Sequence, residues 1–387
     1  MKKKIVILGS TGSIGKTTLK ILKKDKKKFD IKILSTNKNI YLVVKQAKYF
    51  NVKNIIISDY KKYLEAKIKF KKLSINFYNK FSVIDKILKK NKIFYSMISL
   101  VGIEGLEPSL RMIKFSDNIA IANKESIICG WNLIRNNLKK YNTNFIPIDS
   151  EHFSIFSLIK NISSKDIDKI FITASGGPFL NLPKSKLNKV SLKEALQHPI
   201  WKMGNKITID SATMMNKVFE VIEAKNIFDL NYKQISILVH PKSYVHSIVK
   251  FNSGIIKVLL HEPNMKIPIH NSIYSSEKKI KTKQLNLNIL NNLNLKAIDK
   301  KKFPLTYILS KLPKKNSLYE TALITINDYF VKRFLDKKID FYNLLKLIHK
   351  YTNSKEINNL KKIKVKNISQ IFKIRKYVSY KLDKIGI

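Results

Sequence analysis

The stretch IVILGSTGSIG, Ile5 to Gly15, decides the fold that we expect for this chain. Its apolar, β-branched start is typical of a buried strand, and the amphipathic residues beyond it are typical of a helix. Three of the chain's 11 glycines, Gly9, Gly12 and Gly15, lie between the two. Glycines at such a turn let backbone N–H groups approach a pyrophosphate, whose charge the helix N-terminus stabilises. The stretch predicts a dinucleotide-binding turn, spaced G-x-x-G-x-x-G instead of G-x-G-x-x-G, with an ordinary tight turn as the alternative.

The same alternation of strand and helix continues over about the first 150 residues. Short β-branched runs are separated by longer, lysine-rich amphipathic stretches, a pattern typical of a doubly wound parallel sheet. The runs that we interpret as buried strands are 5–8, 31–34, 54–58, 96–102, 119–123 and 145–149. We therefore predict an α/β protein in which residues 1–149 form a Rossmann-like domain.

The composition changes after Ser150. Glycine and proline gather in GGPF (176–179), HPIW (198–201), HPKS (240–243) and HEPNM (261–265), which favours a loop-rich α+β domain over residues 150–274. Residues 275–300 are polar and repetitive, and we predict a linker there. The pattern over residues 301–387 is helical with few turn signals, which predicts a C-terminal helical domain.

The charge of the chain is strongly basic. It has 75 basic and 27 acidic residues among 387, a formal net charge of +48, and such a surplus invites binding to nucleic acid. Yet four of the basic residues are arginines and 71 are lysines scattered throughout the chain, whereas base readout favours arginine forks in one patch. We therefore expect no nucleic-acid partner, although the charge can draw in anionic substrates.

Membrane insertion and disulfides are not expected either. No apolar run approaches the roughly 20 residues of a membrane helix, and the run from Ile5 to Leu8 is shorter than the roughly 7 to 15 residues of a signal-peptide core. The single cysteine, Cys129, excludes an intramolecular disulfide, which suits a reducing compartment. We expect a soluble, cytoplasmic protein.

The end of the second predicted strand indicates which dinucleotide binds. Enzymes that use NAD usually present Asp or Glu there for the ribose 2′-hydroxyl, whereas a cation and hydroxyls suit a 2′-phosphate. This chain has STNKN, Ser35 to Asn39, without an acid. Lys38 with Ser35 or Thr36 can hold the phosphate, so we predict NADPH; the alternative is that Lys38 is one more solvated lysine.

Two carboxylates follow the last predicted strand of the first domain. Asp149 ends the run FIPID, and Glu151 comes in the first turn of the helix predicted from SEHFSIFSLIK, with Ser150 as its expected N-cap. Ligands of open α/β sheets bind at the carboxyl edge of the strands, where this pair lies. The pair can bind a metal, or it can complement the helix dipole.

A third carboxylate favours the metal. In IDSATMMNKVFEVIEAK, residues 209–225, the helical phase puts Met214, Val218, Val221 and Ile222 on one side and Asn216, Lys217 and Glu220 on the other. Ser211 is expected to cap this helix or meet an anion, and Asn216 and Lys217 can donate to a phosphate. Glu220 can complete a Mg²⁺ or Mn²⁺ site with Asp149 and Glu151, because such hard ions prefer oxygen ligands.

These motifs together closely resemble the 1-deoxy-D-xylulose 5-phosphate reductoisomerase family. The resemblance covers residue 1 to about 270 and is weaker in the helical part beyond. It is carried, in the order of the family, by GSTGSIG, IANKES (121–126), PIDSEH (147–152), TASGGPF (173–179), HPIWKMG (198–204) and DSATMMNKVFE (210–220). It implies rearrangement and NADPH-dependent reduction of a ketose phosphate to 2-C-methyl-D-erythritol 4-phosphate, an isoprenoid precursor.

The resemblance also implies roles for individual residues. Asp149, Glu151 and Glu220 are expected to bind the metal, and they count with Lys124 and His198 as the catalytic residues. Substrate contacts are expected from Lys124, Ser150, Glu151, Ser175, His198, Ser211, Asn216, Lys217 and Glu220, and a flap that closes over the substrate from His198, Trp201 and Met203. Cofactor contacts are expected from Thr11, Gly12, Ser13, Ile14, Asn37, Lys38, Asn39, Asn123, Glu125 and Gly204. A homodimer is also implied.

The chain departs from the family's pattern at two positions. Val218 stands where the family usually has glycine, and we expect it to face the core. Asn37 stands where a glycine is common, and asparagine tolerates a positive φ better than other residues with a side chain.

Two other functions remain open at this point. A metal-independent NADP-linked reductase of another phosphorylated carbonyl compound would need no convergent carboxylates. A lysine-rich nucleic-acid-binding protein would bind DNA or RNA in a salt-sensitive manner without turnover.

Overall fold

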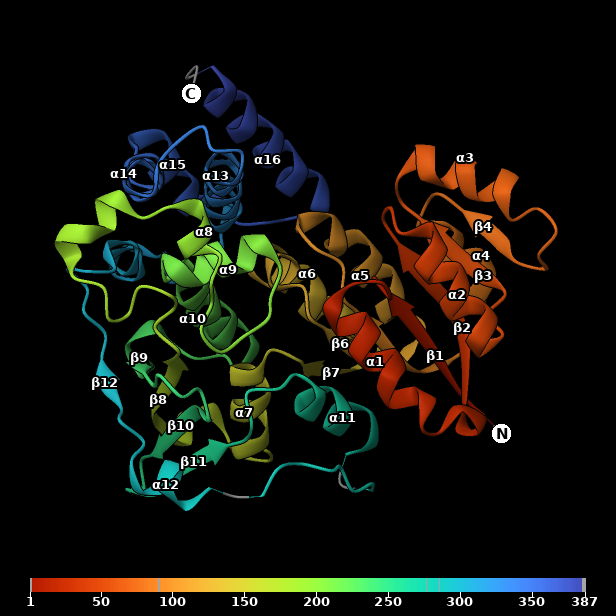
Figure 1. Ribbon diagram of the computed structural model, residues 1–387, viewed down its shortest axis with the longest axis horizontal. Helices are drawn as coiled ribbons and strands as arrows, with labels where there is room; N and C mark the ends of the chain where they lie inside the picture. The colour runs from red at the N-terminus through yellow and green to blue at the C-terminus, as the bar shows by residue number, and fades with distance from the viewer. Residues whose placement is uncertain (1, 90, 276, 285, 385–387) are drawn as a thin grey trace. The chain divides into compact units, whose positions relative to one another are not determined.

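The computed structural model describes residues 2–89, 91–275, 277–284 and 286–384. Their contacts divide the chain into two compact units. The first unit comprises the chain up to Ile127 together with Asn132–Phe153 and Asn264–Lys281, and the second comprises Ile128–Trp131, Ser154–Pro263 and the chain from Thr282 onward. Each unit has its own sheet (Figure 1).

The first unit is built on a parallel sheet, which in the described residues has seven strands in the order β4-β3-β2-β1-β5-β6-β7. The order reverses between β1 and β5, as in a doubly wound fold, so the predicted fold class is confirmed. All six predicted strands are present, and the prediction missed the short β4, whose side chains are at most half-buried. The strands are β1 (Lys3–Leu8), β2 (Phe29–Thr36), β3 (Asn54–Ile57), β4 (Asn76–Tyr78), β5 (Ile93–Ile98), β6 (Ser116–Ile121) and β7 (Asn144–Pro147).

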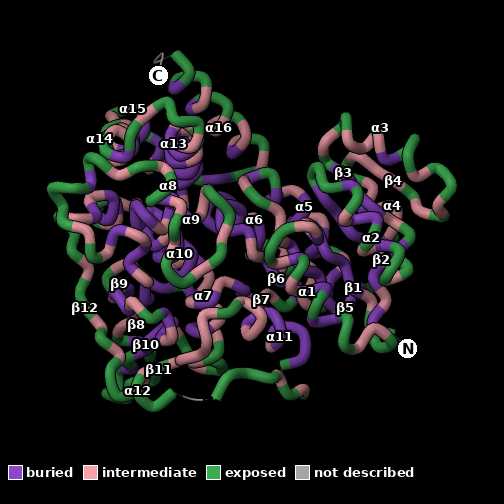
Figure 2. Tube along the Cα trace, viewed as in Figure 1, coloured by how far each residue is buried: buried purple, intermediate pink, exposed green. Residues whose placement is uncertain are grey.

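Helices connect these strands, and their apolar faces join the buried strands in the core, drawn purple in Figure 2. Residues of α6 and α7 belong to both units. The helices are α1 (Ser13–Lys23), α2 (Ile40–Phe50), α3 (Tyr60–Lys69), α4 (Val83–Leu88), α5 (Leu106–Ile113), α6 (Lys124–Tyr141) and α7 (Ser150–Leu158), with short 3-10 turns η1 (Lys26–Lys28) and η2 (Ile103–Gly105).

Helix α11 (Lys266–Tyr274) also belongs to the first unit, although it follows the second unit's strands in the sequence. Its residues Ile269 and Ile273 are buried in the core of the first sheet. Tyr274 packs edge-on against Phe29, with ring centroids 5.8 Å apart. This arrangement differs from the predicted domain of residues 150–274, because these apolar side chains are buried against the first sheet.

The second unit contains a mixed sheet of five strands in the described residues, in the order β11-β10-β8-β9-β12. Helix α10 (Met215–Ile227) covers it, since Val221 and Ala224 of this helix share one core with strand residues such as Ile170 and Ile237. The strands are β8 (Ile167–Ala174), β9 (Ile235–Val239), β10 (Val245–Phe251), β11 (Ile256–Leu260) and β12 (Lys296–Ala297).

The C-terminal part of the second unit is helical, as predicted. Helix α13 is buried along most of its length (Figure 2) and packs against α14 and α16. The helices of this unit are α8 (Leu192–Ala195), α9 (Asn205–Ala212), α10 (Met215–Ile227), α12 (Leu287–Asn291), α13 (Leu318–Leu335), α14 (Phe341–Thr352), α15 (Lys355–Asn359) and α16 (Ile368–Asp383), and the 3-10 turns are η3 (Ser164–Asp166), η4 (Lys184–Lys189), η5 (Tyr232–Gln234), η6 (Pro304–Lys311) and η7 (Leu360–Lys362).

The predicted linker, residues 275–300, is largely exposed where it is described. It nevertheless contains α12 and the two-residue strand β12. Lys296 and Ala297 pair with Val239 and Leu238 of β9, so the end of this segment is fixed to the second unit's sheet.

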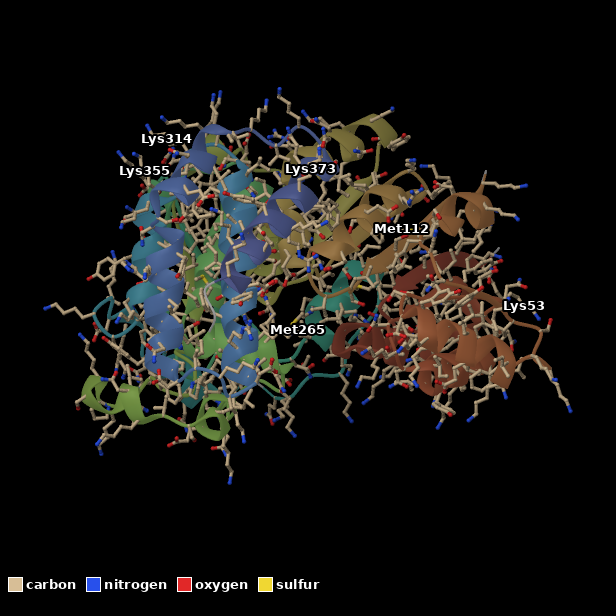
Figure 3. All side chains as sticks on the ribbon, turned by 90° about the horizontal axis from the view of Figure 1, so that it is seen from above. Lys53, Met112, Met265, Lys314, Lys355 and Lys373 are labelled. Carbon is tan, nitrogen blue, oxygen red and sulfur yellow. The ribbon has the colours of Figure 1, made fainter. Side chains whose placement is uncertain are left out.

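Lysines dominate the exposed side chains. Lys53, Lys314 and Lys355 are exposed, and their side chains project outward in Figure 3. Among the described helices, none combines the length and apolarity needed to cross a membrane.

Candidate active site

The glycine turn after β1 is sterically fixed. Gly9 has φ +88°, and a Cβ there would lie 2.4 Å from the carbonyl oxygen of Ser99, which follows β5. A Cβ on Gly15 would lie 2.4 Å from the carbonyl oxygen of Gly9. Helix α1 begins at Ser13 with Gly12 as its N-cap, so its first N–H groups face the turn at the reversal point of the sheet. The geometry of the turn therefore fits a pyrophosphate, and the cofactor contacts of Gly12, Ser13 and Ile14 stay a prediction.

The end of β2 lies beside this turn, but its hydroxyls are engaged. The Ser35 hydroxyl is fully buried and accepts from the Gly9 N–H at 2.8 Å. Thr36 and Thr11 share a hydrogen bond between their hydroxyls at 2.7 Å. Lys38 is exposed, 4.0 Å from Asp59. Of the three predicted 2′-phosphate ligands, only Lys38 has an exposed side chain. Ser35 and Thr36 are buried, and their hydroxyls are hydrogen-bonded to the glycine turn.

Asn37 and Asn39 lie in the loop that follows β2. Asn39 caps α2 by accepting from the Leu42 N–H at 3.1 Å. Asn37 donates to the Ser58 hydroxyl at 2.8 Å and is absent from the described residues with a positive φ. The tolerance of asparagine for a positive φ is therefore not needed here, because the backbone at Asn37 has an ordinary, negative φ.

The predicted site residues at the start of α6 are buried. The Asn123 side chain caps α6 by accepting from the Ser126 N–H, and it donates to the carbonyls of Leu100 and Gly102 at 2.7 Å each. Its amide therefore ties α6 to the loop after β5. The next residues, Lys124 and Glu125, are 9% and 6% exposed.

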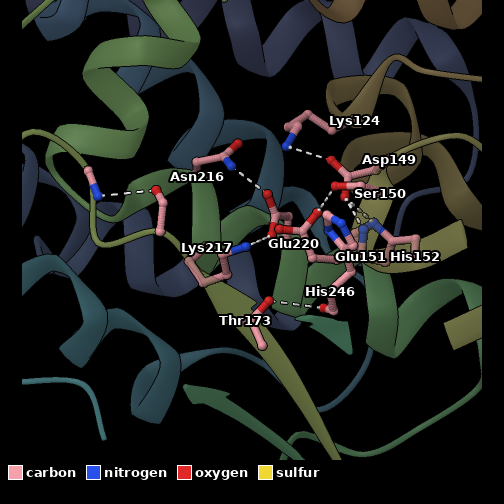
Figure 4. A network of polar contacts seen from close by, with 12 residues as sticks. Lys124, Asp149, Ser150, Glu151, His152, Thr173, Asn216, Lys217, Glu220 and His246 are labelled. Atoms are coloured by element: carbon pink, nitrogen blue, oxygen red, sulfur yellow. Dashed lines mark hydrogen bonds and ion pairs between the residues drawn. The ribbon is translucent and has the colours of Figure 1, made fainter. Parts of the chain in front are cut away.

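Asp149 and Glu151 lie together in the first unit. Carboxylate oxygens of the two residues lie within 4.8 Å of each other, and the Lys124 ammonium is 3.5 Å from Asp149 (Figure 4). The Glu151 N–H donates to Asp149 Oδ1 at 3.3 Å, and the Ser150 hydroxyl donates to Glu151. The Asp149 carbonyl accepts from the Phe153 N–H, so Asp149 caps α7, and the expectation that Ser150 does so is wrong.

Sequence reasoning overlooked His152. Its Nδ1 lies 3.3 Å from Asp149 Oδ1, and its side chain is fully buried. The signal was present in PIDSEH, because a residue three positions after Asp149 lies on the same side of a helix.

In the second unit, the predicted polar residues gather on α10. Glu220 accepts from the Lys217 ammonium and from the Asn216 amide, all on one turn (Figure 4). Lys217 and Glu220 are 4% and 1% exposed, and Val218 is fully buried, which confirms that Val218 faces the core. Ser211 does not cap this helix. It lies in the last turn of α9, and Met214, with φ +62°, is the N-cap of α10.

The predicted flap residues lie in the irregular stretch before α9. His198 Nδ1 accepts from the Trp201 N–H at 2.9 Å, so the proton of the neutral ring is on Nε2, which lies 3.0 Å from the Ser175 hydroxyl. Burial lowers the pKa of His198 to about 4, so the ring is neutral at pH 7. Met203 is half-buried, and Gly204 is the exposed N-cap of α9.

Sequence profiles of one family match most of the chain. The profile of 1-deoxy-D-xylulose 5-phosphate reductoisomerase matches residues 5–130, and profiles of its C-terminal domains match residues 145–228 and 260–379. The similarity thus includes the C-terminal helical part, where the resemblance of the motifs is weaker.

Named relatives agree with these matches. A 1-deoxy-D-xylulose 5-phosphate reductoisomerase from Pelagibacter ubique is 53% identical over 387 residues and all of both chains. One from Wolbachia pipientis wMel is 37% identical over 93% of this chain and 94% of its own.

Solved structures match the fold over nearly the whole chain. The Zymomonas mobilis reductoisomerase in complex with NADPH superposes with a TM-score of 0.86 at 28% identity, covering 98% of this chain and 97% of that one. A DOX-P reductoisomerase in complex with NADPH, fosmidomycin and magnesium gives 0.88 at 29% identity and 99% of both chains. The chain belongs to the 1-deoxy-D-xylulose 5-phosphate reductoisomerase family.

Proposed function

We propose that Asp149, Glu151 and Glu220 together bind the divalent cation with which this NADPH-dependent enzyme converts 1-deoxy-D-xylulose 5-phosphate to 2-C-methyl-D-erythritol 4-phosphate. The observation that carries the proposal is the pair of carboxylates in the first unit, Asp149 and Glu151, whose oxygens lie within 4.8 Å of each other. Glu220 of the second unit supplies the third oxygen ligand.

The donor chemistry fits a hard cation. All three ligands are carboxylates, as Mg²⁺ and Mn²⁺ prefer, and three protein ligands leave coordination positions for substrate oxygens. When bound, the cation polarises the substrate's carbonyl and hydroxyl oxygens, and NADPH supplies the hydride for the reduction. His152, buried against Asp149, holds that carboxylate in place.

Basic and polar side chains around the carboxylates bind the substrate. Lys217 and Asn216 donate to the phosphate together with Ser175 and Ser211, and Lys124 and Ser150 contact substrate oxygens. The buried ammonium of Lys217 is an effective anion ligand because little water screens its charge. Lys217 donates to Glu220, and its ammonium carries further N–H donors that would reach the phosphate while Glu220 would hold the metal.

The stretch around His198 acts as a flap over the bound substrate. His198 organises this turn by accepting from the Ile200 and Trp201 N–H groups, and its other nitrogen reaches Ser175, a proposed phosphate ligand. Closure excludes water, which strengthens the electrostatic interactions inside the site and retains the aldehyde that is to be reduced.

The reaction is tested by mixing the purified protein with NADPH and 1-deoxy-D-xylulose 5-phosphate and following the loss of nicotinamide absorbance. Oxidation should require Mg²⁺ or Mn²⁺, stop with EDTA and collapse in Glu151→Gln. The exposed Glu356→Gln on α15 is the matched control. Oxidation that persists in EDTA would indicate a metal-independent reductase and contradict the proposed site.

We also propose that the protein is a cytoplasmic homodimer formed through β11. This strand is an edge of the second unit's sheet, and its residues Ile256 and Val258 are exposed, as is Ile255 just before it. Exposed apolar residues on a sheet edge favour pairing with another chain. Light scattering should give twice the monomer mass, and Ile256→Lys, but not Leu287→Lys on α12, should give the monomer. A monomeric wild-type protein would contradict the dimer.

A further inference from the structure

Two histidines stack in the second unit at the end of its sheet. The rings of His246 and His261 lie 3.7 Å apart between centroids, with 25° between their planes. His246 comes from the start of β10 and His261 follows β11, and these strands pair through Val245 and Leu260. The register of the hairpin therefore brings the two rings together.

Hydrogen bonds fix both members of the stack. The backbone N–H of His261 donates to the Tyr244 carbonyl at 3.0 Å. The ring Nδ1 of His261 lies 2.6 Å from the Glu262 carbonyl, and it must donate there because a carbonyl can only accept. His246 Nε2 lies 3.2 Å from the His261 carbonyl and must likewise donate. The Thr173 hydroxyl donates to the Val245 and His246 carbonyls, as Figure 4 shows for His246.

The stack contacts the flap. The Trp201 ring meets His246 edge to face, with centroids 6.3 Å apart and 66° between the planes. His246 is 2% exposed, whereas Trp201 is half-buried and lies in a stretch without helix or strand. A rigid, hydrogen-bonded ring thus lies against the large side chain of a segment that has little regular structure of its own.

We propose that His261 is a positioning residue, which holds the His246 ring as the docking surface for Trp201 and so sets how firmly the flap closes over the substrate. This inference rests on the flap role proposed above. His261 acts through His246 and does not itself touch the reacting atoms. Removing its ring leaves His246 free to tilt, so that part of the substrate's binding energy is spent on ordering the flap.

Two substitutions at His261 test separately the contribution of its ring and that of its side-chain hydrogen bond. His261→Asn keeps an N–H donor for the Glu262 carbonyl and loses the ring, whereas His261→Phe keeps a stacking ring and loses the donor. The control is His349→Asn, at an exposed position on α14. All variants are made in Trp131→Phe, so that Trp201 is the remaining one of the chain's 2 tryptophans and reports on the flap.

The first measurement is the time-resolved fluorescence anisotropy of Trp201 in the folded protein without substrate, which requires no activity. His261→Asn should depolarise faster than the parent, and His261→Phe and His349→Asn should match it. The second measurement is the steady-state kinetics with 1-deoxy-D-xylulose 5-phosphate. Loss of the aromatic contact should raise the KM of His261→Asn about fivefold over the parent and leave its kcat within about twofold of the parent's. His261→Phe should have the KM of the parent.

The inference is overturned if His261→Asn shows the parent's anisotropy, or if His261→Phe is the more disturbed variant. It is also overturned if kcat falls while KM is unchanged, because the residue would then affect the chemical step. If the parent itself oxidises no NADPH, the reaction assignment fails, and the anisotropy ranking alone decides whether His261 positions Trp201.

Discussion

Lys217 and Glu220 form an ion pair within one turn of α10, and their side chains are only 5% and 2% exposed. A buried carboxylate that already has a cationic neighbour is costly to keep in a fold for stability alone, because desolvation offsets most of the attraction. This cost motivates our proposal that a ligand uses both members of the pair, with a metal on Glu220 and an anion on Lys217.

Glu220→Gln tests this explanation. The substitution removes one of the proposed metal ligands and leaves Lys217 without its charged partner. We expect a loss of turnover of at least about a hundredfold. Mn²⁺ should raise the Tm of the wild-type protein in differential scanning fluorimetry, and Glu220→Gln should lose this rise. The Glu356→Gln control should keep it, and a full Mn²⁺ response in Glu220→Gln would remove Glu220 from the site.

The glycine turn predicts a graded response. An added Cβ meets backbone atoms at 2.4 Å in Gly9→Ala and Gly15→Ala, but comes no nearer than 3.4 Å in Gly12→Ala. The first two should lower the free energy of unfolding by about 2 kcal/mol or more and weaken NADPH binding, while Gly12→Ala should be mild. Chemical denaturation and calorimetric titration with NADPH measure both effects. Equal effects at Gly12 and Gly15 would contradict the steric account.

Lys38 should discriminate between the two nicotinamide cofactors. Its side chain is exposed, so Lys38→Glu should leave the Tm unchanged while placing a negative charge where we predict that the 2′-phosphate binds. We expect the Kd for NADPH to rise at least about tenfold and the Kd for NADH to change little. Lys53→Glu, at an exposed position before β3, controls for the change in net charge. A parallel loss of both cofactors would show that Lys38 does not contact the 2′-phosphate.

The parts of the fold that the sequence predicts correctly are the strands and helices that follow from the local pattern of apolar and polar residues. Buried, β-branched runs such as Ile5–Leu8 must form strands, and the helical phase of α10 put Val218 in the core. The helix ends are less predictable, because they depend on backbone geometry such as the positive φ of Met214, which makes Met214 and not Ser211 the N-cap of α10.

Other features depend on contacts between distant parts of the chain. Helix α11 joins the first sheet through Ile269 and Ile273, which no periodicity of residues 266–274 reveals. The stack of His246 on His261 requires the register of β10 and β11. The hydrogen bond from the Gly9 N–H to the Ser35 hydroxyl likewise joins the turn after β1 to β2, and no local pattern reveals it.

Glu320 at the start of α13 should make stability depend on pH. Its side chain is 1% exposed, and burial raises its pKa from 4.5 to about 7. The Ser317 N–H and hydroxyl donate to Oε2, whereas Oε1 has no hydrogen-bond partner among the described residues. The folded protein therefore binds this proton more tightly than the unfolded chain does.

The sign of the effect follows from the direction of this shift. Between pH 4.5 and about 7 the folded state holds more protons at Glu320, so the free energy of unfolding falls as pH rises through this window and stays lower above it. The upper limit of the loss is roughly 3 kcal/mol. Buried histidines such as His198, whose pKa is lowered, act in the opposite direction, so the contribution of Glu320 must be isolated by substitution.

Glu320→Gln isolates it, because glutamine cannot ionise. Chemical denaturation between pH 5 and pH 8 should show that the variant gains stability relative to the wild-type protein as pH rises, by up to the same roughly 3 kcal/mol. The exposed Glu356→Gln should follow the wild-type curve at every pH. Parallel curves for Glu320→Gln and the wild-type protein would mean that Glu320 is ionised throughout the range. The partly buried ammonium of Lys225, whose own pKa burial lowers, would then stabilise the carboxylate more than burial penalises it.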